Sequence, residues 1–201
     1  MPRIIGLTGN IACGKTSVGQ MLLELGAERY IDADAIVHRL YEPGQPIAMQ
    51  VAHSFGSAVM AADGSVDRKA LGAIVFQDVE ALRRLENIVH PAVGIALRDE
   101  LMSVSTSGIA ILDAVKLLEG GSGALCQSKW LVICSEEQQL ARLVARNRLQ
   151  KEEAYARIHA QPSTEAKIAL VDEVIDNRAS LEDTRRQVVA AFHRFCDLFP
   201  Q

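Results

Sequence analysis

The chain has 201 residues, of which 49% are hydrophobic and 23% charged, with a formal net charge of −4 at pH 7. This composition predicts a soluble α/β domain with insertions and excludes extensive disorder. The acidic balance argues against nucleic acid as a partner, because binding to a phosphate backbone needs a basic surface. No run approaches membrane-spanning length and the first residues hold no signal-peptide core, so we expect a cytoplasmic protein without a membrane partner.

Short apolar runs alternate with helical patterns along the chain, which is typical of a mainly parallel sheet with helices on both faces. The expected strands are almost continuously apolar, as in a sheet that is covered on both sides. They are residues 4–7, 30–31, 109–112, 130–133 and 174–175. The fold class is therefore α/β, of the P-loop kinase type, with a helical insertion and a lid.

The segment after the first expected strand reads Gly-Asn-Ile-Ala-Cys-Gly-Lys-Thr over residues 9–16. It matches the phosphate-binding pattern Gly-x-x-x-x-Gly-Lys-Thr in full, between a strand and an amphipathic helix. Such a loop surrounds phosphate oxygens with backbone N–H groups at the positive end of a helix. We expect Lys15 to reach the β- and γ-phosphates of ATP and Thr16 to ligate Mg²⁺. The expected ATP-binding residues of this segment are Gly9, Ala12, Cys13, Gly14, Lys15, Thr16 and Ser17.

Two carboxylates, Asp32 and Asp34, follow the second expected strand, at the carboxyl edge where α/β proteins bind ligands. The alternative for each is a turn or helix-capping aspartate, and Asp34 fits the cap of a helix that begins near Ala35. Asp113 ends the third expected strand, where it can hold Mg²⁺ or form a turn.

A long stretch without strands, residues 35–107, is expected to be an insertion that binds the second substrate. It contains the turn signal Asp63-Gly64 and an apolar helical stripe from Leu82 to Val89. We expect His90-Pro91 to interrupt that helix, because proline disfavours helical geometry in the residue before it.

A second special segment, residues 135–167, opens with the capping-box pattern Ser-Glu-Glu-Gln and is rich in basic residues. Arg142 and Arg146 are spaced i, i+4 and so share a helical face. As a mobile lid, the segment would bring these arginines onto the phosphoryl group; a solvated helix face is the alternative. The nucleotide-binding core then comprises residues 1–34, 108–134 and 168–201. Other basic residues of the segment are Arg148, Lys151 and Arg157.

Motifs along nearly the whole chain resemble those of the dephospho-coenzyme A kinase family, and they occur in the family's order. They are residues 5–9, 31–34, 43–44, 55–56, 63–64, 67–68, 71–72, 75–76, 90–91 and 117–119, then Arg142, Arg146, Arg157, Gln161 and residues 175–177. The resemblance implies transfer of the γ-phosphoryl group of ATP to the ribose 3′-hydroxyl of dephospho-coenzyme A, the last step of coenzyme A synthesis. ATP, Mg²⁺ and dephospho-coenzyme A are thus the expected ligands.

The resemblance also implies roles for single residues. It marks Asp32 as the base that accepts the proton of the acceptor hydroxyl, with Lys15 and Arg142 stabilising phosphate charge. It suggests that Asn177 contacts adenine, a turn residue being the alternative. His90, Leu117 and Leu118 are expected at the acceptor, although a histidine such as His90 is often purely structural.

This chain departs from the family pattern at several positions. Asn10 and Ala12 stand where the family usually has glycine, and Ala12 is poorly suited if its site needs a positive φ. Cys13 replaces serine; near a helix N-terminus we expect a favoured thiolate, or else a small residue in place of serine. Lys116 replaces proline and is expected either to bind the diphosphate of the acceptor or to lie in solvent. Ala179 stands where a glycine is common.

Two other functions stay open from the residues alone: a kinase of another small acceptor, such as a nucleoside or sugar, and an ATP sensor without catalysis. The four cysteines lack disulfide or zinc-site spacing, which favours reduced thiols. The oligomeric state is not indicated.

Overall fold

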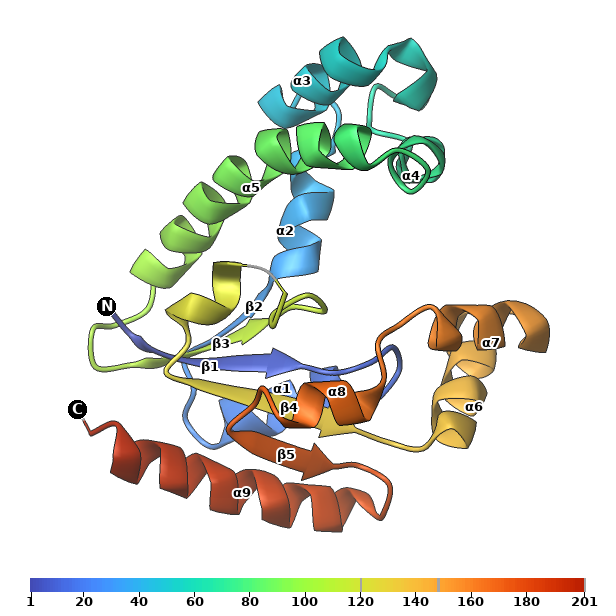
Figure 1. The fold of residues 1–201 in the computed structure, drawn as a ribbon. Helices are drawn as coiled ribbons and strands as arrows, with labels where there is room; N and C mark the ends of the chain where they lie inside the picture. Colours follow the sequence, from blue (N-terminus) through green and yellow to red (C-terminus); the bar gives the residue numbers. More distant parts are fainter. Residues whose placement is uncertain (120, 148, 201) are drawn as a thin grey trace. The chain divides into compact units, whose positions relative to one another are not determined.

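The computed structural model describes residues 1–119, 121–147 and 149–200 (Figure 1). Arg148, one of the expected lid residues, lies outside these ranges. The chain divides into two compact units: a core unit, Met1–Ile31 with Leu101–Gln201, and a helical unit, Asp32–Glu100.

The core unit is built on a five-stranded sheet in the order β2-β3-β1-β4-β5. The strands are β1 (Arg3–Thr8), β2 (Arg29–Asp32), β3 (Ile109–Asp113), β4 (Ser128–Ile133) and β5 (Glu173–Asp176). β1 pairs in parallel with both β3 and β4, and β4 pairs in parallel with β5. All five expected strands are confirmed, and their apolar residues are buried because helices or loops cover both faces.

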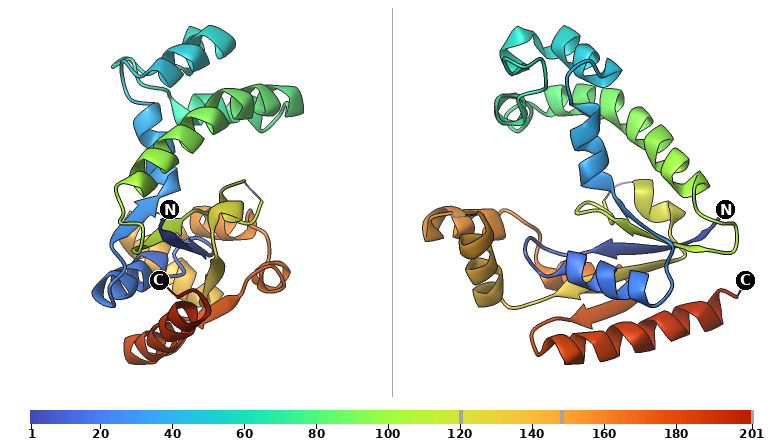
Figure 2. Two further views of the ribbon diagram at one scale, coloured as in Figure 1. Left: turned by 90° about the vertical axis from the view of Figure 1, so that its left-hand side faces the viewer. Right: turned by 180° about the vertical axis from the view of Figure 1, so that it is seen from behind.

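Helices α1 (Lys15–Glu24) and α9 (Leu181–Leu198) cover one face of the sheet. Figure 2 (right) shows α1 in front of the strands and α9 below them. Alternate residues of β1, such as Ile5 and Leu7, point into this layer and pack with the apolar stripes of both helices. The remaining buried members of this cluster are Cys13, Val18, Met21, Leu22, Ala27, Ile109, Ile111, Trp130, Val132, Ile175, Val188, Ala191, Phe192 and Phe195. The expected first and last helices are therefore confirmed.

Three further helices belong to the core unit: α6 (Glu136–Asn147), α7 (Lys151–His159) and the short α8 (Thr164–Ile168). The capping box at the start of α6 is confirmed. Ser135 N donates to Gln138 Oε1 (3.1 Å), and Gln138 N donates to Ser135 Oγ (3.3 Å). A small apolar cluster joins α6 to α7 and also contacts Ile11 and Ala12 of the phosphate loop. A 3₁₀ turn, η2 (Gly121–Leu125), precedes β4.

The helical unit contains α2 (Ala33–Leu40), α3 (Pro46–Phe55), the 3₁₀ turn η1 (Ser57–Val59), α4 (Arg68–Val75) and most of α5 (Val79–Met102). It has its own apolar core, formed by Tyr41, Ile47, Ala48, Val51, Val59, Val66, Leu71, Val75, Ala81 and Val89. The expected turn at Asp63-Gly64 is present: Asp63 Oδ1 accepts from Ser65 N (2.9 Å), and Gly64 has φ 86°.

The expected break at His90-Pro91 is wrong, because α5 runs through Pro91. Pro91 is exposed, so its ring meets solvent, and the helix bends along its length (Figure 1) instead of ending. The apolar residues on either side of the proline hold both halves in the helix.

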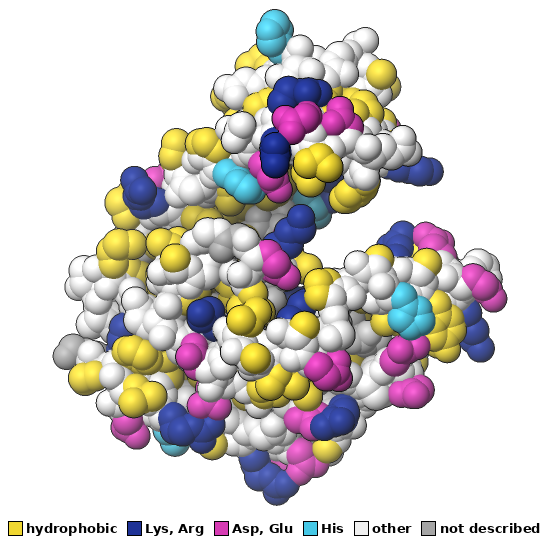
Figure 3. Space-filling view, viewed as in Figure 1, with side chains coloured by type: hydrophobic (Ala, Val, Ile, Leu, Met, Phe, Trp, Pro, Cys, Tyr) yellow, Lys and Arg dark blue, Asp and Glu magenta, His cyan; other side chains and the backbone are white. Residues whose placement is uncertain are grey.

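Acidic and basic side chains are interspersed over the face of each unit that Figure 3 shows. Among the helices of the described residues, none has the length and apolar character needed to cross a membrane.

Candidate active site

The phosphate loop, residues 9–16, joins β1 to α1 and requires glycine at both ends. Gly9 has φ 153°, and a Cβ there would lie 2.5 Å from the carbonyl oxygen of Val132. Gly14 has φ 103°, and a Cβ there would lie 2.1 Å from the amide nitrogen of Asn177. Any larger residue would therefore open the loop or displace its neighbours.

Ala12 adopts the left-handed conformation, with φ 58°, and is the one non-glycine residue among those described with a positive φ. The site of Ala12, where the family usually has glycine, therefore does need a positive φ. The clash between its Cβ and the backbone costs about 1–2 kcal/mol.

Three side chains from different parts of the core unit bind carbonyl oxygens of the loop. Lys15 Nζ donates to Gly9 O (3.1 Å), and Arg142 Nη1 donates to Ala12 O (3.1 Å). Asn177 Nδ2 donates to Cys13 O (2.8 Å). These contacts fix the carbonyls of the loop, so that its shape is set before a ligand arrives.

Lys15 and Arg142 thus meet at the phosphate loop, as the sequence predicts. Arg142 reaches the loop from α6, whereas Arg146, one turn later on the same helix, is exposed. Thr16 and Ser17 lie in the first turn of α1, and both are exposed. The positive end of α1 is therefore aimed at the loop together with two cationic side chains.

Asn177 follows β5 and is only 7% exposed. Its Oδ1 accepts from Thr184 Oγ1 (2.9 Å), while its Nδ2 binds the loop at Cys13. Sequence reasoning missed this bracing role. An Asn that follows a strand signals a turn, and nothing local shows that its amide reaches a loop 164 residues earlier.

Asp113 ends β3 and is 7% exposed, and its carboxylate accepts a hydrogen bond from the hydroxyl of Tyr30. No cluster of three or more His, Cys, Asp or Glu with metal-binding geometry occurs among the described residues. The Asp113 carboxylate and the Thr16 hydroxyl are nevertheless oxygen donors of the kind that suits Mg²⁺, which takes few protein ligands and keeps waters and substrate phosphates.

Asp32 ends β2 and forms the N-cap of α2, since its Oδ1 accepts from Ala35 N (2.9 Å). The prediction that Asp34 caps this helix is wrong. The helix begins at Ala33, so Asp34 lies in its first turn, where a carboxylate also suits the helix dipole. Both carboxylates are exposed.

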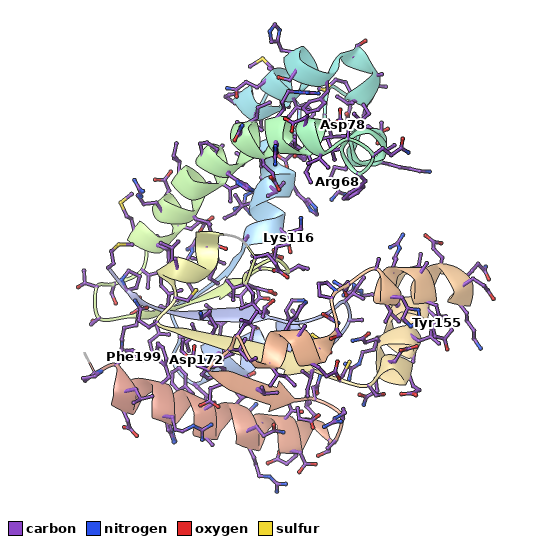
Figure 4. All side chains as sticks on the ribbon, viewed as in Figure 1. Arg68, Asp78, Lys116, Tyr155, Asp172 and Phe199 are labelled. Carbon is purple, nitrogen blue, oxygen red and sulfur yellow. The ribbon has the colours of Figure 1, made fainter. Side chains whose placement is uncertain are left out.

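The loop after β3 carries three of the residues expected at the acceptor, Lys116, Leu117 and Leu118. Lys116 is exposed on this loop, as labelled in Figure 4. Leu117 has no exposed surface, because it packs against Gly6 and Gly123; in this arrangement it supports the loop and offers no surface to an acceptor. Leu118 is half-buried. His90 belongs to the helical unit, where it is exposed on α5.

The expected thiolate at Cys13 is wrong. The side chain is 1% exposed, and burial raises the pKa of the Cys13 thiol to about 11, although Lys15 opposes this shift. Desolvation therefore exceeds the favourable field of the helix N-terminus. Cys13 is a small buried residue of the loop.

Sequence reasoning also missed a second set of contacts, between the tip of the loop and the segment that leads from α7 to α8. Gln161 Oε1 accepts from Ile11 N (2.7 Å), and Pro162 O accepts from Asn10 Nδ2 (3.2 Å). Lys167 Nζ donates to Asn10 Oδ1 (2.7 Å). These contacts join residues about 150 positions apart, so no local pattern shows them.

A family model described as dephospho-CoA kinase matches residues 3–183. The dephospho-CoA kinase of Symbiobacterium thermophilum is 47% identical over 196 residues, covering 96% of this chain and 82% of that protein. Among solved structures, TT1252 from Thermus thermophilus is 34% identical with a TM-score of 0.83, covering 96% of this chain and 97% of its own. The dephospho-CoA kinase from Campylobacter jejuni is 25% identical with a TM-score of 0.59 at the same coverage.

Proposed function

The chain belongs to the dephospho-CoA kinase family, and we propose that its phosphate loop, Lys15, Arg142 and Asp32 carry out that family's reaction. The reaction transfers the γ-phosphoryl group of ATP to the ribose 3′-hydroxyl of dephospho-coenzyme A, giving coenzyme A and ADP. The observation that carries this assignment is the convergence of Lys15 and Arg142 on a phosphate loop whose carbonyls are already bound.

The donor phosphates bind at the N–H groups of the loop and at the N-terminus of α1. Lys15 exchanges the carbonyl of Gly9 for a phosphate oxygen, which is a stronger, charge-assisted partner. Arg142 lies close enough to the loop to share charge that develops on the transferring group. Arg146 is assigned the same task once the lid, residues 135–167, is closed.

The acceptor hydroxyl loses its proton to the carboxylate of Asp32. The hydrogen bond from Ala35 N holds one carboxylate oxygen and so orients the side chain without neutralising it. The attacking oxygen is thereby made more nucleophilic as the phosphoryl group leaves ADP.

Mg²⁺ would be held by Thr16 and Asp113 together with the ATP phosphates, and when bound it would neutralise charge on the phosphate oxygens. We assign Asn177 to the adenine of ATP. We assign Lys116, Leu118 and His90 to the acceptor, and residues 35–107 to the acceptor-binding insertion.

The test is ADP release from ATP and Mg²⁺ with four additions: dephospho-coenzyme A, coenzyme A, a set of nucleosides and sugars, and no acceptor. Coenzyme A is the matched control, because its 3′-hydroxyl already carries the phosphate. Of the four additions, only dephospho-coenzyme A should give fast ADP release. Equal release with every addition would indicate an ATPase, and faster release with a nucleoside or sugar would indicate another kinase.

A further inference from the structure

Lys167 is an ammonium buried beside the phosphate loop. It belongs to α8, is 3% exposed, and donates from Nζ to Asn10 Oδ1 (2.7 Å). An ammonium has three N–H donors, and no carboxylate lies within 4.0 Å of this one in the part of the chain that the structure describes. Burying an ammonium with no carboxylate in direct contact is costly, so the fold holds it there against its solvation preference.

The side chain of Asn10 is oriented to hold this ammonium. Its Nδ2 donates to Pro162 O (3.2 Å), which leaves Oδ1 to accept from Lys167. Ile11, the next residue of the loop, donates its N–H to Gln161 Oε1 (2.7 Å). The tip of the loop and the segment 161–167 are therefore tied together, with Lys167 in a fixed place.

Two ammonium groups are held at consecutive residues of one loop, Lys15 on the carbonyl of Gly9 and Lys167 on the side chain of Asn10. Burial lowers the pKa of Lys167; Glu119 opposes that shift, and the positive charge of Lys15 adds to it. Like charges at close range repel each other, and an anion that binds between them relieves both the repulsion and the missing solvation. This arrangement favours a highly charged anion at the start of the loop.

We propose that Lys167 is a second phosphate-contacting lysine: the terminal phosphate of ATP binds between the ammonium groups of Lys15 and Lys167, with Asn10 positioning Lys167. The assignment deepens the proposed function and rests on ATP as the ligand of the loop. It gives a task to Asn10, which departs from the usual family glycine and supplies the hydrogen-bond acceptor that a glycine lacks.

The experiment is equilibrium binding of ATP, ADP and AMP, without acceptor, to Lys167→Met. This change removes the charge and keeps an unbranched apolar stem. Arg186→Met, which removes a positive charge at an exposed position of α9, is the control. We expect ATP to bind at least about 10-fold more weakly to Lys167→Met than to the parent, since a charge-assisted contact to the terminal phosphate is gone. The affinity for ADP should fall less, and the affinity for AMP should not change. The salt dependence of ATP binding should also become shallower.

A purely structural Lys167 predicts another result. Equal weakening of all three nucleotides, or a lower melting temperature with unchanged nucleotide discrimination, would overturn the proposal. Asn10→Gly keeps the charge and removes its positioning, so we expect a smaller loss in the same order of nucleotides.

If Lys167→Met does not fold, the parent protein still decides the matter through ¹⁵N NMR of its lysine Nζ groups, assigned with Lys→Arg variants. ATP should shift the signals of both Lys15 and Lys167, whereas a shift at Lys15 alone would refute the proposal. Binding is measured without acceptor, so a parent that binds ATP and phosphorylates nothing would contradict the proposed reaction and leave this test intact.

Discussion

The residues assigned to the phosphate donor and those assigned to the acceptor differ in how far folding has already fixed them. On the donor side, Lys15, Arg142 and Asn177 each make a hydrogen bond to the phosphate loop. On the acceptor side, Asp32 and Lys116 are exposed. The donor residues are thus held at the phosphate loop before a ligand binds. On the acceptor side, Asp32 is oriented by its hydrogen bond from Ala35 N, whereas the exposed Lys116 must be ordered when the acceptor binds.

The positions of these residues in the fold explain the difference. The phosphate loop follows β1, the central strand, and receives side chains from α6 and from the residue after β5. The acceptor residues lie at the start of α2, on α5 and on the loop after β3, where Asp32, His90 and Lys116 are exposed. Donor-side substitutions should therefore lower turnover, and those at acceptor contacts should raise the Michaelis constant of the acceptor.

Asp32→Asn tests the one acceptor-side residue that is expected to act on turnover. We expect kcat to fall by about 10²–10⁴, the range for a positioned general base, with ATP affinity unchanged. Asparagine is as good an N-cap as aspartate, so α2 should keep its start and its stability. Asp34→Asn is the matched control and should leave kcat near the parent value. A collapse of ATP binding in Asp32→Asn would make this residue a nucleotide or metal ligand.

Lys15→Ala removes the ammonium that binds the loop carbonyl and, in the proposed reaction, a phosphate oxygen. We expect kcat to fall by about 10²–10³, the loss typical of one preorganised charge-stabilising donor. Circular dichroism and thermal melting should show an intact fold. Near-parental turnover in the folded variant would remove Lys15 from the mechanism.

Lys116→Ala tests an exposed acceptor contact. The expected result is a several-fold rise in the Michaelis constant for dephospho-coenzyme A, with that for ATP unchanged, because one contact to the diphosphate is lost. Added salt should weaken acceptor binding less than in the parent. Lys151→Ala is the control. If the acceptor constant and its salt dependence stay parental, Lys116 is a solvent-facing residue.

Ala12→Gly relieves the positive φ in the phosphate loop. We expect the free energy of unfolding to rise by about 0.5–1 kcal/mol, because the relieved backbone strain exceeds the entropy that glycine adds to the unfolded chain. Ala156→Gly, at an exposed position inside α7, should lower it by about 1 kcal/mol. Chemical denaturation measures both, and equal destabilisation would mean that the loop bears no strain at Ala12.

We expect Cys13 to resist alkylation in the folded enzyme at pH 7.5. A pKa raised from 9.0 to about 11 leaves about 100-fold less thiolate than an ordinary cysteine, and the side chain is buried. Reactivity should appear only as the pH rises toward that pKa. Mass spectrometry after iodoacetamide treatment locates the modified cysteines, with unfolded protein as the positive control. Rapid, ATP-protected modification of Cys13 would contradict the burial argument.

Much of the fold could be predicted because its signals are local. The five apolar runs, the phosphate loop and the capping box before α6 each lie within a few consecutive residues, and all are present. Predictions from neighbouring residues were wrong at two places where two local effects compete. At Pro91 the apolar pattern outweighed the proline, and at Asp32 the cap formed two residues before the expected one.

By itself, the sequence determined the strand pattern, the phosphate loop and its lysine, because hydrophobic periodicity and turn chemistry act between close neighbours in the chain. Only the tertiary structure decided which side chains brace that loop. Asn177 and Lys167 reach it from 164 and 157 residues away, and burial rather than the helix dipole sets the state of the Cys13 thiol. Hydrogen bonds and desolvation depend on distances in space, which a linear pattern does not contain.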